Sequence, residues 1–245
     1  MRLIRVFVES TLSPGARIDA GGTAAAHIAR VLRLVAGDPV TLFNGDGNDY
    51  PARIAALRSS RVDIEVLDRV PARSESPLRL SLVQGIARAE RMDLIVQKAT
   101  ELGVAAIQPV VTVRSVVRLD ASTTERKLAH WRGIVIAACE QCGRARLPAI
   151  GMPLPLSEWL AGPPPDSVRR LQLAVDSPES LASTAAGAGS IELLIGPEGG
   201  LDESERKSAA SAGYRGCSIG PRVLRTETAA LAALAVLQAA AGDLG

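Results

Sequence analysis

The chain has 245 residues and a formal net charge of +2, and 47% of its residues are hydrophobic although only 2% are aromatic. This length fits one large domain or two smaller ones, with a core built from aliphatic side chains. The sequence has no bilayer-length apolar run, no signal-peptide core and only three cysteines without framework spacing, which argues against a membrane-spanning or secreted protein and predicts a cytoplasmic one.

Charge is distributed unevenly along the chain. Residues 1–73 and 74–149 carry net charges of +2 and +4, whereas residues 150–245 carry −4. The bias would suit a polyanionic partner such as nucleic acid, although ordinary solvated surfaces often show as much. Charge alone therefore favours nucleic acid only weakly.

The first seventy residues predict short strands and one helix. Strands are expected at residues 3–8, 39–43 and 62–66. The Gly and Asn residues of segment 44–48 suit a hairpin turn. Helical spacing of apolar residues is found at Ile28, Val31, Leu32 and Val35. These elements predict a small β-barrel with one helix, followed by a linker between Pro71 and Pro77.

From residue 78 onward the predicted strands alternate with helices. The strands are expected at residues 78–83, 107–113, 171–175 and 191–195. The helices are expected around residues 92–102, 128–138, 202–213 and from near Thr226 onward. Asp202 and Glu205 have the spacing of a capping box. Such alternation indicates an α/β domain with a mainly parallel sheet.

A glycine-rich loop at residues 196–200 follows the last of these strands. Its sequence is Gly196-Pro197-Glu198-Gly199-Gly200. Glycines there let the backbone approach a ligand closely, at the carboxyl end of a strand where α/β sheets bind ligands. The loop is neither a P-loop nor the dinucleotide fingerprint. The alternative interpretation is a plain strand–turn–helix joint.

A second loop about twenty residues later has a similar design. A strand ends near Ile219, Gly220 and Pro221 turn the chain, and a cluster of Arg222, Arg225 and Glu227 lies where the last helix begins. A helix start with Thr226 as its cap and Glu227 near the positive end of the dipole is the alternative. That alternative does not explain why Arg222 and Arg225 lie near the positive end of the helix dipole. A bound anion or a functional contact would explain them.

Cys139 and Cys142 form a C-x-x-C pair, a pattern found in zinc and redox sites. No second pair exists, and His27 and His130 lie at unsuitable spacings for ligands. Structural thiols are the preferred interpretation, and no metal site is predicted.

The two loops together resemble the signature of the ribosomal RNA small subunit methyltransferase E family, part of the SPOUT superfamily of knotted methyltransferases. Further similar segments follow in the same order at residues 27–33, 42–45, 97–104 and 137–144. Residues 155–190 carry little that matches.

The resemblance implies a PUA-like RNA-binding β-barrel domain at residues 1–72. It also implies a SPOUT-type α/β domain with a trefoil knot at residues 73–245, a topology that pattern alone would not suggest. The implied activity is methylation of uridine N3 in 16S ribosomal RNA, within the small ribosomal subunit, by a homodimer that uses S-adenosylmethionine. Neither a membrane nor a metal is expected as a partner.

Site residues follow from the same resemblance. The cofactor is expected to contact Gly196, Pro197, Glu198, Gly199, Gly200, Ile219, Gly220 and Leu224. Arg225 or another cation of the loops is expected to stabilise the uridine anion, and Glu227 to accept its proton or to orient Arg225. RNA phosphates are expected to meet Arg5, Arg30, Arg33, Arg88, Arg114, Arg118, Arg144 and Arg146, each of which could instead be a solvated surface residue.

The chemistry accounts for the lack of a catalytic triad or metal motif. Methyl transfer from a sulfonium needs an in-line nucleophile at roughly 3–3.5 Å in a dry site. Two other functions stay open, namely a non-catalytic RNA-binding or ribosome-assembly factor and a knotted enzyme that methylates the ribose 2′-hydroxyl. A Rossmann methyltransferase is disfavoured because no glycine-rich loop follows residues 78–83.

Overall fold

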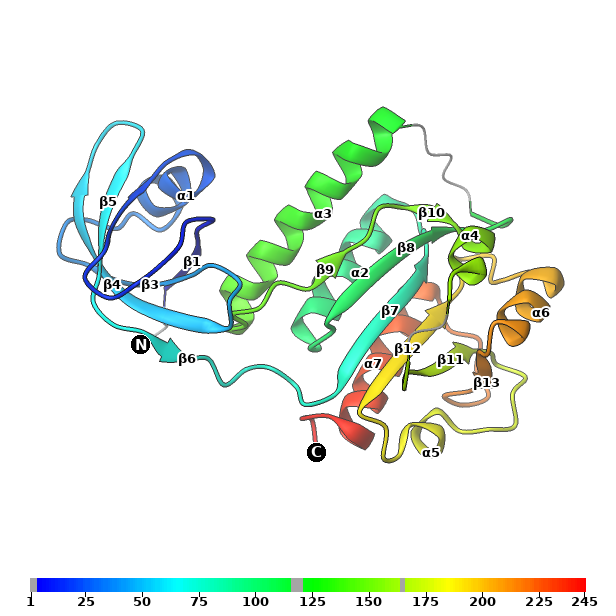
Figure 1. Ribbon diagram of the computed structural model, residues 1–245. Coiled ribbons are helices and arrows are strands. Elements are labelled where there is room, and N and C mark those ends of the chain that lie inside the picture. Colours follow the sequence, from blue (N-terminus) through cyan, green and yellow to red (C-terminus); the bar gives the residue numbers. More distant parts are fainter. Residues whose placement is uncertain (1–3, 116–120, 164–165) are drawn as a thin grey trace. The chain divides into compact units, whose positions relative to one another are not determined.

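The computed structural model describes residues 4–115, 121–163 and 166–245 (Figure 1). The chain divides into two compact units, of which unit 1 comprises residues 1–75 and 136–147 and unit 2 comprises residues 76–135 and 148–245. Because unit 1 is discontinuous in the chain, the domain boundary expected between residues 72 and 73 stays a prediction.

Unit 1 contains a six-stranded sheet. Its strands are β1 (Arg5–Phe7), β2 (Arg17–Ala20), β3 (Pro39–Phe43), β4 (Asn48–Leu57), β5 (Val62–Val66) and β6 (Val70–Pro71). Their order is β1-β3-β4-β5-β2, with β6 paired to β4. Strands β3 and β4 pair antiparallel, which confirms the predicted hairpin. Since β1 and β2 lie at the two ends of the order, a closed barrel stays a prediction.

The helix predicted in unit 1 is wrong in its extent. A short helix α1 (Gly22–Ala26) leads into one π-helical turn η1 (His27–Val31), and Arg33 has a positive φ of 55°. Ile28 is buried as expected, but Val31 and Val35 are 70% and 61% exposed. A π-helical turn is wider than an α-helical one, so side chains at α-helical spacing no longer share a face.

Unit 2 contains a seven-stranded sheet in which every recorded pair is parallel. Its strands are β7 (Arg79–Gly85), β8 (Ala106–Val111), β9 (Ala149–Ile150), β10 (Leu154–Pro155), β11 (Arg169–Leu173), β12 (Ser190–Ile195) and β13 (Arg215–Cys217). Their order is β10-β8-β7-β12-β11-β13, with β9 paired to β8. The predicted parallel α/β sheet is therefore confirmed.

Each helix of unit 2 follows one of its strands along the chain. They are α2 (Ala89–Glu101), α3 (Ala121–Cys142, whose last turns count with unit 1), α4 (Leu156–Ala161), α5 (Leu181–Ala185), α6 (Glu203–Ser211) and α7 (Thr226–Ala241). On one face, α4 and α6 pack over Val83, Val110 and Leu194 of the central strands. Helix α7 packs with α2 and α5, and Figure 1 shows α2 and α7 behind the central strands. No helix in the described ranges is both long enough and apolar enough to span a bilayer.

Candidate functional site

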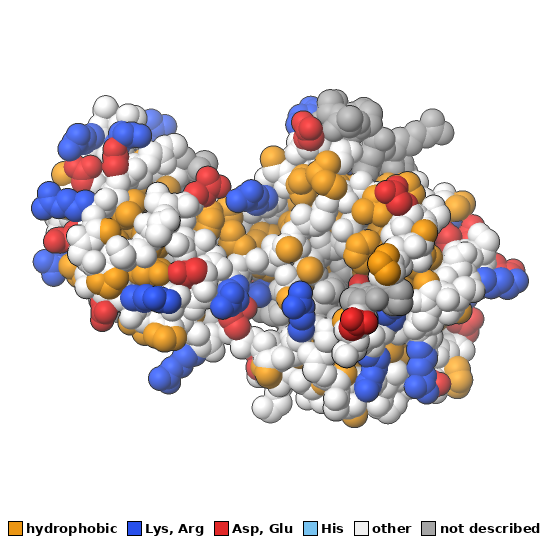
Figure 2. Space-filling view, viewed as in Figure 1, with side chains coloured by type: hydrophobic (Ala, Val, Ile, Leu, Met, Phe, Trp, Pro, Cys, Tyr) orange, Lys and Arg blue, Asp and Glu red, His pale blue; other side chains and the backbone are white. Residues whose placement is uncertain are grey.

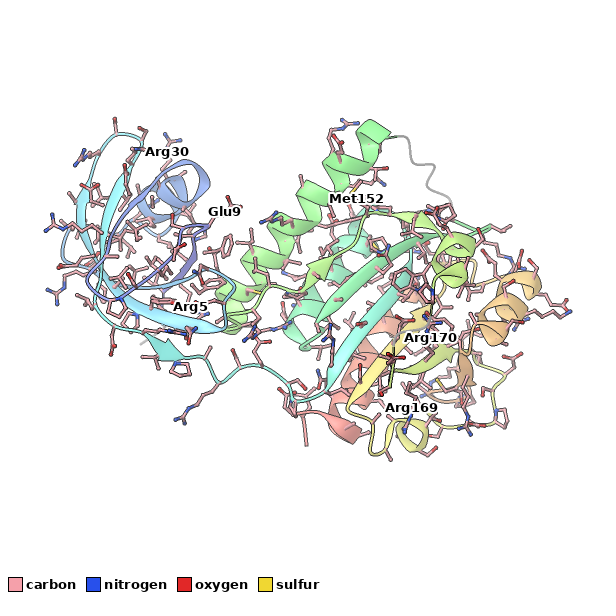
Figure 3. All side chains as sticks on the ribbon, in the orientation of Figure 1. Arg5, Glu9, Arg30, Met152, Arg169 and Arg170 are labelled. Carbon is pink, nitrogen blue, oxygen red and sulfur yellow. The ribbon has the colours of Figure 1, made fainter. Side chains whose placement is uncertain are left out.

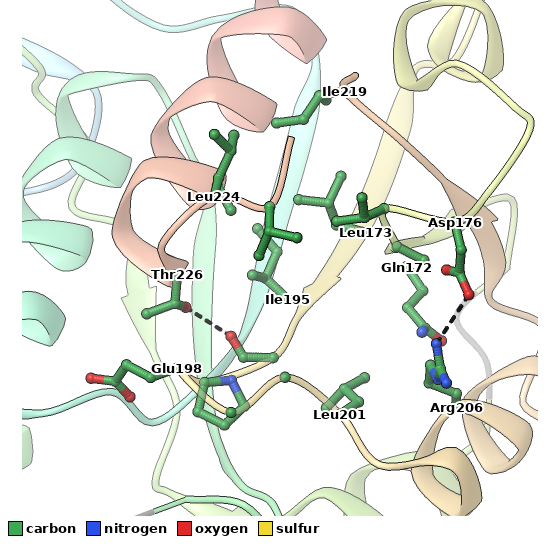
Figure 4. A pocket seen from close by; sticks show the side chains of 18 of the residues that line it. Gln172, Leu173, Asp176, Ile195, Glu198, Leu201, Arg206, Ile219, Leu224 and Thr226 are labelled. Atoms are coloured by element: carbon green, nitrogen blue, oxygen red, sulfur yellow. Dashed lines mark hydrogen bonds and ion pairs between the residues drawn. The ribbon is translucent and has the colours of Figure 1, made fainter. Parts of the chain in front are cut away.

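The loops that follow β11, β12 and β13 surround a cavity of about 530 Å³ (Figure 4). Ligands bind to α/β sheets at the carboxyl ends of their strands, so the cavity lies where such a site is expected. All eight residues that were predicted to bind a cofactor line it, namely Gly196, Pro197, Glu198, Gly199, Gly200, Ile219, Gly220 and Leu224. Their contact with a cofactor stays a prediction.

The cavity also has lining residues that the sequence did not point to. Leu173 and Asp176 come from β11 and the segment after it, and Arg206 comes from α6. Arg206 Nη1 lies 3.3 Å from Asp176 Oδ2, so an ion pair forms part of the wall (Figure 4). The end of a predicted parallel strand at residue 175 was the one available signal for this side of the cavity.

The first loop is bonded to both neighbouring segments. The Thr226 hydroxyl donates to the Gly196 carbonyl oxygen at 2.7 Å, and Gln84 Nε2 donates to that hydroxyl at 3.0 Å. Gly85 lies so close to Pro197 that a β-carbon on it would come within 2.5 Å of the proline ring. The interpretation of Thr226 as helix cap is wrong, because Arg225 is the N-cap and the Thr226 side chain bonds to the loop instead.

The backbone of the two loops requires glycine at two positions. A capping box fixes the start of α6, the helix that follows the first loop. Gly200 and Gly220 have φ values of 68° and 128°, which L side chains rarely adopt. The Asp202 carboxylate accepts a hydrogen bond from the Glu205 amide at 2.7 Å, and the Glu205 carboxylate accepts one from the Asp202 amide at 2.9 Å. The predicted capping box is thus confirmed.

Glu198 attaches the first loop to the beginning of α2. Its Oε1 atom accepts hydrogen bonds from the Arg88 amide at 3.0 Å and from Arg91 Nη1 at 3.1 Å. Burial alone would raise the pKa of Glu198, but these hydrogen bonds together hold the pKa below its ordinary value. Figure 4 shows the carboxylate directed away from Leu201 and Arg206, so it serves as an anchor of the loop.

The two residues expected to be catalytic lie at the start of α7. Arg225 is exposed, and the Glu227 side chain is 14% exposed. Arg91 Nε lies 3.7 Å from Glu227 Oε1, while Glu227 Oε2 is buried and has no hydrogen-bond partner within the described ranges. Among the described residues the recorded ion pair of Glu227 is therefore with Arg91, a residue that sequence reasoning missed, and not with Arg225. An arginine one turn after Arg88 was the only hint of it.

Two of the arginines expected to meet RNA lie inside unit 1. Arg5 is 6% exposed and donates to Asp49 at 2.6 Å and to the Arg144 carbonyl oxygen at 3.0 Å. Arg144 is 4% exposed and donates to Glu75 at 2.9 Å. Buried guanidinium groups with carboxylate partners are not free to bind phosphate, so these two are better explained as structural residues.

The other predicted arginines have different surroundings. Exposed side chains are found at Arg30, Arg33, Arg88 and Arg146. Figure 3 shows Arg30 at the surface of unit 1, and Figure 2 shows Lys and Arg side chains on this unit with Asp and Glu among them. Arg114 lines the cavity and donates to the Gly199 carbonyl oxygen at 2.9 Å. Arg118 lies outside the described residues.

The C-x-x-C pair has no recorded ligand partners. Within the ranges that the structure describes, no group of three or more His, Cys, Asp or Glu side chains is arranged to hold a metal ion. Cys139 is buried, and burial raises the pKa of its thiol to about 12. Such a thiol is protonated at neutral pH and is a poor nucleophile or ligand.

Comparisons with known proteins agree with this architecture. A family model described as an RNA methyltransferase domain matches residues 74–238, and one described as an RNA methyltransferase PUA domain matches residues 21–67. The chain is similar to ribosomal RNA small subunit methyltransferase E of Mycobacterium bovis, with 32% identity over 93% of this chain and 88% of the relative. The protein of that name from Buchnera aphidicola is 29% identical over 99% of this chain and 98% of its own length.

Solved structures of similar proteins contain a bound molecule. A methyltransferase from Legionella pneumophila, solved with the cofactor SAM, has a TM-score of 0.94 and 37% identity over the full length of both chains. Ribosomal RNA small subunit methyltransferase E from Neisseria gonorrhoeae, solved with S-adenosyl methionine, has a TM-score of 0.93 and 36% identity over the same coverage.

Proposed function

The chain belongs to the ribosomal RNA small subunit methyltransferase E family, and we propose that it methylates N3 of a uridine in 16S ribosomal RNA with S-adenosylmethionine as the methyl donor. The observation that carries this proposal is the cavity between residues 196–200 and 219–224. Two glycine-containing loops from separate strands enclose one space at the carboxyl edge of a parallel sheet, and its size suits a small organic ligand.

The cavity suits the chemical parts of S-adenosylmethionine. Apart from the glycine and its two chain neighbours, no described residue has an atom within 4 Å of the place where a β-carbon would stand on Gly200 or Gly220, so open space adjoins the backbone of both loops. Ile195, Ile219 and Leu224 offer apolar contacts to a purine ring. When bound, S-adenosylmethionine supplies a methyl group that its sulfonium makes electrophilic.

Methylation of uridine N3 requires that the base be accessible and that its N3 proton be removed. Uridine N3 carries a proton and lies on the pairing edge, so the base must be unpaired or flipped out before it reacts. In this proposal Arg225 stabilises the anion that develops on the base, and Glu227 accepts the N3 proton. Arg225 lies between Leu224 and Thr226 in the chain and Glu227 follows Thr226, and Leu224 and Thr226 line the cavity.

RNA binding is assigned to exposed arginines. Arg30, Arg33 and Arg146 of unit 1 and Arg88 of unit 2 have side chains that phosphates could reach. The small ribosomal subunit in the cytoplasm is the proposed site of action. Arg5 and Arg144 are left out of this set of arginines because each is buried with a carboxylate partner.

A homodimer is part of the proposal, and a groove between α2 and α7 is its proposed contact. The groove is lined mainly by apolar residues, namely Leu94, Leu102, Leu231, Ala232 and Ala235, with Lys98, Glu101, Glu227 and Thr228 beside them. Leu94 is 37% exposed in the single chain. A second copy that covers these residues would remove apolar surface from water and place Glu227 at the contact.

The trefoil knot and the closed PUA-like barrel are proposed as well. Strand β13 lies at the far edge of its sheet, yet the next helix, α7, packs with α2. The chain therefore returns past the loop after β12, to which Thr226 is bonded. A return of this kind supports a knot.

The decisive experiment compares 16S ribosomal RNA from a deletion strain and its parent by nucleoside mass spectrometry. Loss of one N3-methyluridine, restored by the gene, is the expected result. A lost ribose methylation would show that the 2′-hydroxyl is the target instead. Calorimetric titration with S-adenosylmethionine tests the remaining rival, because a pure assembly factor has no need to bind it.

A further inference from the structure

Arg91 stands between two carboxylates, Glu198 of the first cavity loop and Glu227 at the start of α7, where Glu227 lines the groove between α2 and α7. It donates to Glu198 of the first loop at 3.1 Å, and its Nε lies 3.7 Å from Glu227 at the start of α7. The Arg91 side chain is 35% exposed, whereas the Glu198 and Glu227 side chains are 20% and 14% exposed. One cation in the first turn of α2 is thus shared by two largely buried acids.

The two acids depend on Arg91 to different degrees. Glu198 keeps a second anchor, because the Arg88 amide also donates to its Oε1 atom at 3.0 Å. For Glu227, the recorded ion pair within the described part of the chain is that with Arg91. Loss of the Arg91 guanidinium would leave Glu198 attached but would free the Glu227 side chain to rotate.

The second carboxylate oxygen of Glu227, Oε2, is available to accept a hydrogen bond from a substrate. Oε2 is buried and has no hydrogen-bond partner among the residues that the structure describes, although buried carboxylate oxygens are normally satisfied. A donor that arrives with the substrate would complete it, and the N3–H group of uridine is such a donor. A carboxylate can accept that proton effectively only if its position is fixed within a fraction of an ångström.

We infer that Arg91 is a positioning residue for methyl transfer, holding Glu227 so that its free oxygen accepts the uridine N3 proton. This inference rests on the proposed function. In the step, the N3–H proton passes to Glu227 Oε2 and the nitrogen electron pair forms the bond to the methyl carbon. The carbon–sulfur bond breaks with its electrons on sulfur, which gives N3-methyluridine and S-adenosylhomocysteine.

A double-mutant cycle on the full-length protein tests the inference. Single-turnover methylation of small subunits from a deletion strain is measured for wild type, Arg91→Ala, Glu227→Gln and the double variant. Arg91→Ala should slow transfer about 100-fold, the scale of loss that a misplaced catalytic group causes, and should leave S-adenosylmethionine affinity and the melting temperature nearly unchanged. In the Glu227→Gln background the same change should cause little further loss.

Two more variants separate positioning from simple loss of charge at a surface. Arg91→Lys keeps the cation without the planar fork and should recover part of the rate. Lys207→Ala removes an exposed cation that pairs with Glu203 at 2.7 Å on α6, and it should behave as wild type.

Several outcomes would overturn the inference. Additive losses in the cycle, an unimpaired Arg91→Ala, or a loss of cofactor binding or stability that parallels the loss of rate would each show that Arg91 does not act through Glu227. A wild-type protein that binds S-adenosylmethionine but forms no N3-methyluridine would instead overturn the proposed function, and the inference with it.

Discussion

The Thr226 hydroxyl and the Gly196 carbonyl oxygen are joined by a hydrogen bond of 2.7 Å, which ties the first residue of α7 to the first residue of the loop after β12. The same hydroxyl accepts a hydrogen bond from Gln84 at the end of β7. One small side chain therefore connects three segments that lie far apart in the sequence. Both loops of the cavity depend on this connection.

Replacing Thr226 by Val keeps the shape of the side chain but removes both hydrogen bonds. We expect the free energy of unfolding to fall by about 1–3 kcal/mol, because buried polar groups on Gly196 and Gln84 lose a partner. Affinity for S-adenosylmethionine should fall too. Urea denaturation and calorimetric titration measure the two effects. Thr11→Val, the same change at an exposed threonine, should alter stability by less than about 0.5 kcal/mol, and equal losses from both variants would contradict the prediction.

Gly85→Ala should displace the first loop of the cavity. The new β-carbon would stand 2.5 Å from the Pro197 ring and backbone nitrogen, so backbone atoms must move. We expect a stability loss of about 1–3 kcal/mol and a clear loss of cofactor affinity in titration. The control is Gly133 on α3, where nothing lies within 4 Å. Gly133→Ala should raise stability by about 0.5–1 kcal/mol, and the prediction fails if both alanine variants bind cofactor alike.

Acid should weaken the anchor that Glu198 provides. Hydrogen bonds from the Arg88 amide and Arg91 outweigh burial and hold the pKa of Glu198 below its ordinary value of 4.5. A lowered folded-state pKa contributes stability that is fully present above pH 4.5 and is lost as the pH falls through the folded pKa. Wild type should therefore melt higher than Glu198→Gln at pH 7, and this difference should shrink below pH 4.5. A difference that stays constant with pH would contradict it.

Arg30 and Arg5 should respond in opposite ways to substitution. Arg30→Ala removes an exposed side chain, so stability should hold while the slope of log affinity for RNA against log salt drops by about one unit. Arg5→Met leaves Asp49 without its partner and should cost at most roughly 3 kcal/mol, because Asp49 is 23% exposed and partly screened by water. Melting curves and filter binding at several salt concentrations measure the pair. A stable Arg5→Met with a lowered salt slope would restore Arg5 as an RNA contact.

The elements that sequence predicts well are those whose pattern depends on near neighbours. Val62, Ile64 and Val66 alternate with acidic residues, and all three are buried in β5. The capping box of α6 needs only two residues three positions apart, and it forms as expected. Around Ile28 the same reasoning failed, because the choice between α-helical and π-helical turns depends on packing within unit 1 and leaves no mark in the spacing.

In the candidate site, too, local features could be predicted from the sequence and long-range contacts could not. The loops at residues 196–200 and 219–224 are visible in the sequence because glycine and proline mark their turns. Arg91 and Asp176 are not visible, since each reaches its place through the pairing of strands distant in the chain. Arg5 shows the reverse error, because a basic residue predicted to be a phosphate ligand is buried and paired with the Asp49 carboxylate.

The bond between Thr226 and Gly196 also bears on how the protein is made. The other residues that line the cavity precede α7 in the chain, so a nascent chain that emerges from the ribosome has no complete cavity until Thr226 and Ala229 of α7 have been synthesised. Closure then requires contacts over a long sequence separation, which slows folding. S-adenosylmethionine can consequently stabilise only the finished unit, and a low supply of it during growth should prolong the time in which new molecules are open to proteolysis.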